Sequence, residues 1–217
     1  MYKYTFADFN IRILDFFTKH RSREEPLLQA INSLSAKRNG LYLEYGVYKG
    51  NSITQAHESM PEWDLYGFDS FDGLPEKWRN GFDKGCFGLG GHVPILHPSI
   101  NLIKGWFETS IPHWIAFHGQ YAVADLIHID CDLYSSTKTI LNNIDYLIRP
   151  SHTILVFDEL INYPGYENHE IKALHEYCSN KNYDVEMLYC GGYNMEKFAI
   201  KVVATLQNNK RRYVKLL

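Results

Sequence analysis

Apolar residues recur at helical spacing in the first 38 residues, as in Phe9, Ile13 and Phe17 and again in Leu27 and Ile31. This period predicts two helices before any strand. A turn at residues 39–40 then leads into residues 41–46, an apolar run that ends in glycine. A helical stretch over about residues 52–60 follows it. The pattern is typical of a strand, turn and helix unit.

The same unit returns along the chain with variations. Helical segments separate most of the short apolar runs that predict buried strands, at residues 65–68, 101–103, 125–129 and 153–157. Strands that alternate with helices indicate a parallel sheet with helices on both faces. After a helix over about 168–181, two runs at 184–188 and 197–203 flank Gly191-Gly192 and predict a C-terminal antiparallel hairpin. We therefore expect a Rossmann-like α/β fold with a mostly parallel, seven-stranded sheet.

Residues 71–98 interrupt this rhythm with glycines and prolines. Irregular segments of that length in a compact domain are commonly functional. We interpret residues 71–98 as a lid and residues 1–38 as N-terminal helices, both within one domain over residues 1–217.

Composition excludes several classes of protein. The 22 Lys and Arg residues against 25 Asp and Glu residues give a formal charge of −3, so we expect no nucleic-acid partner. The longest apolar runs, such as residues 153–157, fall far short of the roughly 20 residues that a membrane span needs. Asp8, Arg12 and Asp15 interrupt the start of the chain as no signal peptide would, so we expect a cytoplasmic protein. The four cysteines have no C-x-x-C spacing and are expected to be reduced.

The first candidate site follows the first predicted strand. Glu44, Gly46 and Gly50 form an E-x-G-x-x-x-G pattern, whose glycines let a ligand approach the backbone closely. Asp69 ends the second strand, 23 residues after Gly46, where a carboxylate in a doubly wound fold accepts hydrogen bonds from ribose hydroxyls. Together these residues predict an adenosine-containing cofactor. A turn cap remains the alternative for Asp69.

A second candidate site is acidic. Asp130 and Asp132 follow one predicted strand, and Asp158 and Glu159 follow the next. In a parallel sheet these carboxyl ends share one crevice. Clustered carboxylates repel one another unless they hold a cation or share a proton, and oxygen ligands favour Mg²⁺ first, with Ca²⁺ or Mn²⁺ as alternatives. Asp130, Asp158 and Glu159 therefore predict a metal site, whereas Asp132 could equally cap the next helix.

Four histidines are further candidates for chemistry. His128 lies within a predicted strand, and we interpret it as a packed core residue rather than a base. His57, His92 and His97 remain open as catalytic candidates.

The motifs in this order resemble the macrocin O-methyltransferase (TylF-like) family of class I S-adenosylmethionine-dependent methyltransferases. The resemblance covers about residues 40–175 and is carried by residues 43–50 (LEYGVYKG), 67–75 (GFDSFDGLP), 104–107 (KGWF), 129–137 (IDCDLYSST) and 157–160 (FDEL). It implies a methyltransferase of sugar hydroxyls, with S-adenosylmethionine as cofactor and Mg²⁺ as a second cofactor. Related enzymes often self-associate, so a homodimer is a further expectation.

The resemblance also implies roles for individual residues. Glu44, Gly46 and Gly50 would line the methionine end of the cofactor, Asp69 the ribose, and Ser70, Gly105 and Trp106 the adenine. Asp130 would contact the cofactor, serve as the base and bind the metal with Asp158 and Glu159. The family often has two adjacent aspartates where this chain has Asp158-Glu159, and the longer glutamate can still ligate Mg²⁺ but changes the reach.

We therefore expect an S-adenosylmethionine-dependent O-methyltransferase of a glycosyl or other small polyhydroxy acceptor. One alternative is a methyltransferase-like binding protein without turnover. Another is a nicotinamide-dependent oxidoreductase. Asp69 would fit that class, but this chain lacks the G-x-G-x-x-G loop that binds the dinucleotide. A nucleic-acid base methyltransferase would carry an Asn-Pro-Pro-Tyr-type motif in place of residues 130–133.

Overall fold

A computed structural model describes residues 4–119, 121 and 123–205. The two predicted N-terminal helices are present as α1 (Phe6–His20) and α2 (Pro26–Leu34). Thr5 and Asp8 form a reciprocal capping box that satisfies free backbone amides at the start of α1. Pro26 begins α2, where its missing N–H costs no helical hydrogen bond.

The sheet is the expected one, seven strands in the order β3-β2-β1-β4-β5-β7-β6. The first five strands run parallel, while β7 is antiparallel to both β5 and β6. The strands are β1 (Leu41–Tyr45), β2 (Asp64–Asp69), β3 (Ile100–Lys104), β4 (Leu126–Ile129), β5 (Ile154–Phe157), β6 (Tyr183–Gly191) and β7 (Lys197–Ala204). This confirms the predicted α/β fold class and the C-terminal hairpin.

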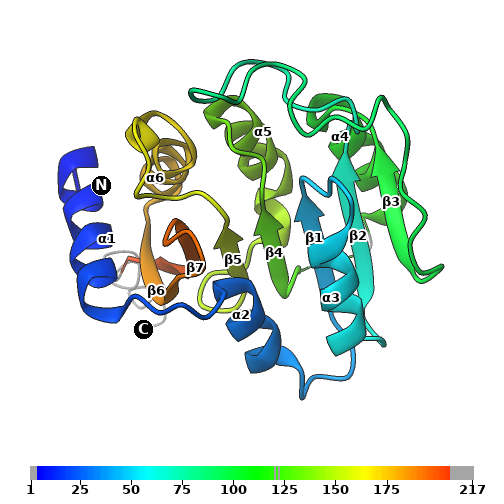
Figure 1. Ribbon diagram of the computed structural model, residues 1–217. Coiled ribbons are helices and arrows are strands. Elements are labelled where there is room, and N and C mark those ends of the chain that lie inside the picture. Colours follow the sequence, from blue (N-terminus) through cyan, green and yellow to red (C-terminus); the bar gives the residue numbers. More distant parts are fainter. Residues whose placement is uncertain (1–3, 120, 122, 206–217) are drawn as a thin grey trace, which may run out of the picture.

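Helices cover both faces of the sheet (Figure 1). On one face lie α2 and α3 (Asn51–Ser59), and their side chains pack with Tyr42, Leu65 and Val156. On the other face lie α4 (Phe107–His118), α5 (Tyr134–Ile144) and α6 (Glu170–Lys181). Helix α1 lies beside β6, at the end of the sheet (Figure 1).

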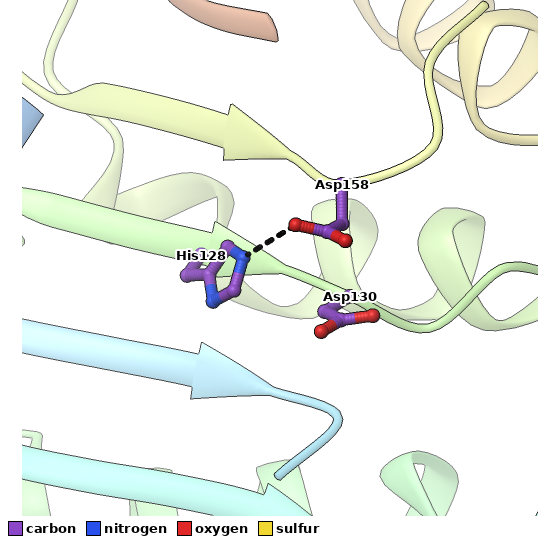
Figure 2. A group of neighbouring side chains, drawn as sticks. All are labelled: His128, Asp130 and Asp158. Carbon is purple, nitrogen blue, oxygen red and sulfur yellow. Dashed lines mark ion pairs between the residues drawn. The ribbon is translucent and has the colours of Figure 1, made fainter. Parts of the chain in front are cut away.

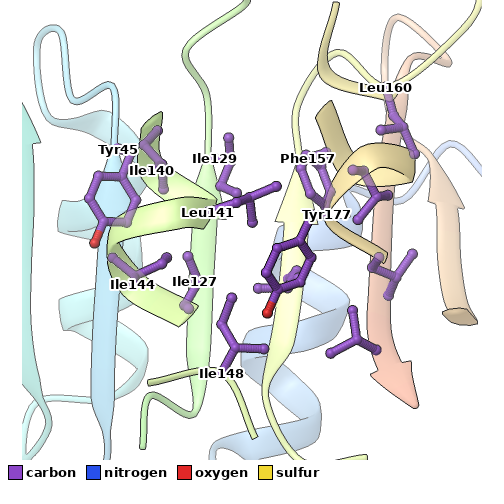
Figure 3. Packing of buried hydrophobic residues seen from close by; sticks show 14 of the residues in the cluster. Tyr45, Ile127, Ile129, Ile140, Leu141, Ile144, Ile148, Phe157, Leu160 and Tyr177 are labelled. Atoms are coloured by element: carbon purple, nitrogen blue, oxygen red, sulfur yellow. The ribbon is translucent and has the colours of Figure 1, made fainter. Parts of the chain in front are cut away.

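The larger hydrophobic core fills the space between the sheet and α5 and α6. Ile127 and Ile129 of β4 and Phe157 of β5 meet Leu141 of α5 and Tyr177 of α6 there (Figure 3). Burial of each such side chain stabilises the fold by about 1.5–3 kcal/mol. Because a strand turns alternate residues to opposite faces, the neighbouring side chain His128 lies on the α2 and α3 face.

The lid, residues 71–98, is described throughout, and none of its residues belongs to a helix or a strand. It crosses the edge of the sheet where the parallel strands end (Figure 1). A small apolar cluster includes Leu74 and Trp78 of the lid together with Leu133 and Tyr163. The lid is therefore an ordered cover with a core of its own.

The structure also bears on the cysteines and on membrane-spanning helices. All four cysteines are free, and Cys131, Cys178 and Cys190 are buried. Among the residues described, no helix combines the length and the apolar character that crossing a membrane requires.

Candidate active site

The turn after β1 lies directly against the end of β4. Gly46 has φ of +94°, and a Cβ atom there would lie 1.7 Å from the carbonyl oxygen of Asp130. Gly50 also has positive φ and precedes the first residue of α3. Gly46 thus allows two backbone segments of the protein to approach closely, while the approach of a ligand to these glycines stays a prediction.

Asp69 ends β2 and holds two loops in place. Its Oδ2 accepts hydrogen bonds from the amides of Val47 and Tyr48, both at 2.8 Å, and its Oδ1 accepts one from Phe71 at 2.7 Å. The turn-cap interpretation of Asp69 is therefore confirmed. It does not displace the binding role, because a carboxylate has about four lone-pair sites and Asp69 still lines a cavity.

This cavity, here called the lid cavity, has a volume of about 290 Å³ and lies between the lid and the ends of β1 to β4. Six of the eight residues predicted to bind the cofactor line it: Gly46, Asp69, Ser70, Gly105, Trp106 and Asp130. Leu74 and Phe87 of the lid, together with Asp132 and Glu159, lie on its walls. The sequence motifs therefore converge on one cavity.

A second cavity of about 710 Å³, here called the α3 cavity, lies on the α2 and α3 face. Gly50, Ser52, His128, Asp158 and Lys197 line it. Tyr48 and Asp130 line both cavities. Asp130 thus marks the junction between the two.

Glu44 is placed differently from the expectation that it faces the cofactor. Its side chain is fully buried and is absent from the described linings of both cavities. It accepts hydrogen bonds from the hydroxyls of Tyr42 and Ser52, and His128 Nδ1 lies 3.2 Å from its Oε2. Glu44 thus anchors the first turn of α3 through its hydrogen bond with Ser52.

The three carboxylates predicted to bind a metal are not gathered into one group. One group within 4.8 Å joins His128, Asp130 and Asp158, and another joins Asp130, Asp132 and Glu159. Asp158 lines the α3 cavity and Glu159 the lid cavity, because consecutive residues at a strand end turn to opposite faces. Figure 2 shows His128 directed at Asp158, with Asp130 beside them.

Asp132 lines the lid cavity, and its alternative role as the helix cap is wrong. The N-cap position of α5 is Leu133, while Asp132 has φ of +65° and places its buried side chain beside Glu159 on the lid cavity. The sequence signal for a place at the cavity is the spacing of two residues between Asp130 and Asp132. Capping fits the sequence equally well, because a helix begins just after Asp132.

Burial and mutual repulsion make these carboxylates hard to ionise together. Desolvation raises the pKa of Asp130, and the negative charge of Asp158 raises it further. Desolvation and Asp158 also raise the pKa of Asp132, and desolvation and Asp130 raise that of Glu159. Burial likewise disfavours the charged form of His128, yet Asp158 and Glu44 raise its pKa above the usual range. The carboxylates at the lid cavity therefore need a cation or shared protons. Asp158 differs from them, because the ammonium group of Lys197 and the ring of His128 lie beside it.

The group of Asp130, Asp132 and Glu159 fits a hard divalent ion. All three donors are carboxylate oxygens, as Mg²⁺ prefers. Oε2 of Glu159 is buried without a hydrogen-bond partner among the described residues, which leaves it free to act as a ligand.

The other histidine candidates lie away from this site. His57 stacks on His97 with a centroid distance of 4.3 Å, and His92 is exposed on the lid. The described linings of both cavities include none of the three. His128 is 1% exposed in β4, as expected of a core histidine.

Solved structures of methyltransferases share the fold. CalS11, a calicheamicin methyltransferase, is 20% identical, with 81% of this chain and 76% of that chain covered at a TM-score of 0.61. The O-methyltransferase NovP is 17% identical, with 82% and 78% covered at a TM-score of 0.58. An O-methyltransferase from Bacillus cereus in complex with SAH is 13% identical, with 89% of both chains covered at a TM-score of 0.51. Curated protein sequences give no match.

The sequence itself carries the family. Residues 43–160, more than half of the chain, match the profile of a methyltransferase domain family. They span β1 to β5 and include every residue predicted to bind the cofactor or a metal. This match confirms the expected methyltransferase class and argues against the nicotinamide-dependent oxidoreductase. The chain belongs to the methyltransferase domain family.

Proposed function

We propose that this protein is an S-adenosylmethionine-dependent O-methyltransferase that methylates a hydroxyl of a sugar or a related small polyhydroxy acceptor. The observation that carries the proposal is the convergence of Gly46, Asp69, Ser70, Gly105, Trp106 and Asp130 on one lid-covered cavity. The narrower resemblance to the macrocin O-methyltransferase family and the sugar acceptor both belong to this proposal. A second structure of CalS11, described as a TDP-rhamnose 3'-O-methyltransferase, is consistent with a sugar acceptor.

The lid cavity suits the adenosyl part of the cofactor. Asp69 can accept hydrogen bonds from ribose hydroxyls, and Trp106, which is 41% exposed at the cavity, offers a ring face to the adenine. Gly46 lines the same cavity beside Asp130, so the cofactor would pass close to this turn. Asp130 would then stand where the cofactor ends and the acceptor begins.

The reaction needs little beyond alignment and removal of one proton. S-adenosylmethionine supplies a methyl group that is already activated, so the protein has to hold an acceptor oxygen in line with it. Asp130 would take the hydroxyl proton as the general base. A divalent ion held by Asp130, Asp132 and Glu159 would supply positive charge that favours deprotonation of a nearby hydroxyl.

The proposal is tested by calorimetric titration of S-adenosylhomocysteine into the protein with and without Mg²⁺. We expect binding that weakens at least tenfold in Asp69→Ala and survives in Asp158→Ala, whose side chain faces the other cavity. Asp64→Ala, at the first residue of the same strand, is the matched control for Asp69. Absence of binding under both conditions would contradict the proposal and favour a binding protein of another kind.

A further inference from the structure

Lys197 places an ammonium group at the candidate active site from a distant part of the chain. It is the first residue of β7, and its Nζ lies 2.8 Å from Oδ1 of Asp158 and 3.1 Å from Oε2 of Glu25. The side chains are 20% exposed for Lys197 and 13% for Asp158. An ion pair as shielded as this one is screened by solvent much less than a surface pair.

The ring of His128 faces the same carboxylate oxygen. Nε2 of His128 lies 3.5 Å from Oδ1 of Asp158, and Nδ1 of His128 lies next to Glu44. The two acidic partners of His128 therefore keep its ring between them. Asp158 thus has its charge compensated by the protein itself, on the α3 side of the sheet.

The backbone holds Lys197 in this place. Glu25 accepts a hydrogen bond from the amide of Tyr193 at 2.8 Å, and Gly192 donates its amide to the carbonyl of Ser22 at 3.0 Å. The turn between β6 and β7 is thereby fastened to the segment that leads into α2. Lys197 follows that turn, and its ammonium group lies between Glu25 and Asp158.

A divalent ion bound to Asp158 would lie within a few ångströms of this ammonium group. Two cations at that separation repel each other, so the Lys197 contact opposes binding of a divalent ion to Asp158. Glu159 and Asp132 face the lid cavity instead, away from Lys197.

We propose that Lys197 is a positioning residue that occupies the cation place at Asp158, so that this chain binds a divalent ion through Asp130, Asp132 and Glu159 without Asp158. The inference rests on the proposed function insofar as both concern the same site. It differs from the ligand set expected from the sequence, in which Asp158 is a direct ligand.

The test is titration of the full-length protein with Mn²⁺, followed by the electron paramagnetic resonance signal of the free ion. In Lys197→Met, Asp158 loses its ammonium partner and becomes available, so we expect Mn²⁺ to bind at least tenfold more tightly than in the wild type. The second substitution in Lys197→Met/Asp158→Asn should remove this gain. Lys201→Met, four residues and thus two strand repeats further along β7 and outside both cavity linings, should leave the Mn²⁺ affinity within threefold.

Two single variants keep the test decisive if Lys197→Met folds poorly. Asp132→Asn should weaken Mn²⁺ binding at least tenfold, and Asp158→Asn should leave it within threefold. Equal losses in these two variants would overturn the proposal, as would unchanged or weaker binding in folded Lys197→Met. A loss of S-adenosylhomocysteine affinity in Lys197→Met without a change in Mn²⁺ affinity would also overturn it, because Lys197 would then serve the cofactor. Failure of the wild type to bind S-adenosylhomocysteine would contradict the proposed function instead, whatever the Mn²⁺ titrations give.

Discussion

Gly46 and Asp130 meet backbone to backbone, so closely that a Cβ atom on Gly46 would overlap the carbonyl group of Asp130. The contact joins the first turn of the sheet to the end of its central strand. Both cavities open beside it, since Asp130 lines each of them. Space at this position is therefore a requirement of the site and of the fold together.

Gly46→Ala should be strongly destabilising. The overlap with Asp130 and the positive φ of +94° both oppose a side chain, and we expect a loss of about 3 kcal/mol or more in the free energy of unfolding. Chemical denaturation measures this loss. Gly81→Ala is the matched control, because Gly81 also has positive φ but has open space around it, so about 1–2 kcal/mol is expected there. Equal losses in the two variants would contradict the close-contact argument.

Trp106→Ala should weaken cofactor binding without harming stability. The ring is 41% exposed at the lid cavity, and losing a stacked base contact of about 1–2 kcal/mol lowers the affinity for S-adenosylhomocysteine roughly five- to thirtyfold. Calorimetry and thermal unfolding measure the two effects. Phe117→Ala removes a ring that is 69% exposed from α4, the helix that Trp106 precedes, and should change neither quantity. An unchanged affinity in Trp106→Ala would place the adenine elsewhere.

Arg79→Ala should loosen the lid. The guanidinium lies 3.8 Å from the ring centroid of Trp78 and 4.7 Å from that of Tyr163, and it pairs with Glu196 in the turn between β6 and β7 at 3.4 Å. Loss of contacts worth about 1–2 kcal/mol should raise the open fraction of the lid roughly tenfold. Limited proteolysis within residues 71–98 reports this opening.

The control for Arg79 is Lys77→Ala, in the same part of the lid. Lys77 pairs with Asp83 at 3.1 Å with both side chains mostly exposed, so its removal should leave the cleavage rate close to that of the wild type. Similar cleavage rates in the two variants would show that the lid is held by other contacts.

Asp125→Asn should make the free energy of unfolding depend less on pH in the acid range. Burial opposes ionisation of Asp125, but hydrogen bonds from Lys37, from the amide of Leu41 and from His152 outweigh it and lower its pKa. A carboxyl whose folded pKa lies below its unfolded value stabilises the protein above about pH 4 and loses this effect as the pH falls through the folded pKa. After allowance for solvent screening, we expect the variant to be about 1 kcal/mol less stable at pH 7.

Urea denaturation at several pH values measures the difference for Asp125. The gap between wild type and Asp125→Asn should close below about pH 4. A gap that stays constant down to acid pH would mean that the asparagine lowers stability by packing alone.

Short-range pattern explains why much of the fold was predictable. The seven runs coincide with the seven strands. The signal is strong for β4 and β5, because parallel strands that are buried along their whole length have to be mostly apolar on both faces. Asp69 was placed correctly for a similar reason, since the end of the second strand of a doubly wound sheet meets the first turn.

The details of the acidic site were harder to predict. Adjacent carboxylates at the end of β5 turn to opposite faces, so Asp158 and Glu159 could have been assigned to separate cavities from strand periodicity. Lys197 gave no such signal, because it is 39 residues away from Asp158 and reaches it only after β7 pairs with β5.

The position of β7 also has a consequence for biosynthesis. As a nascent chain leaves the ribosome, β5 emerges well before its neighbour β7, and β6 emerges before the strand that joins it to the sheet. Until β7 inserts between them, the edge of β5 stays open to pairing with other chains. The same late step delivers Lys197 to Asp158. The insertion of β7 during folding thus completes the sheet and the charge balance of the candidate active site in one step.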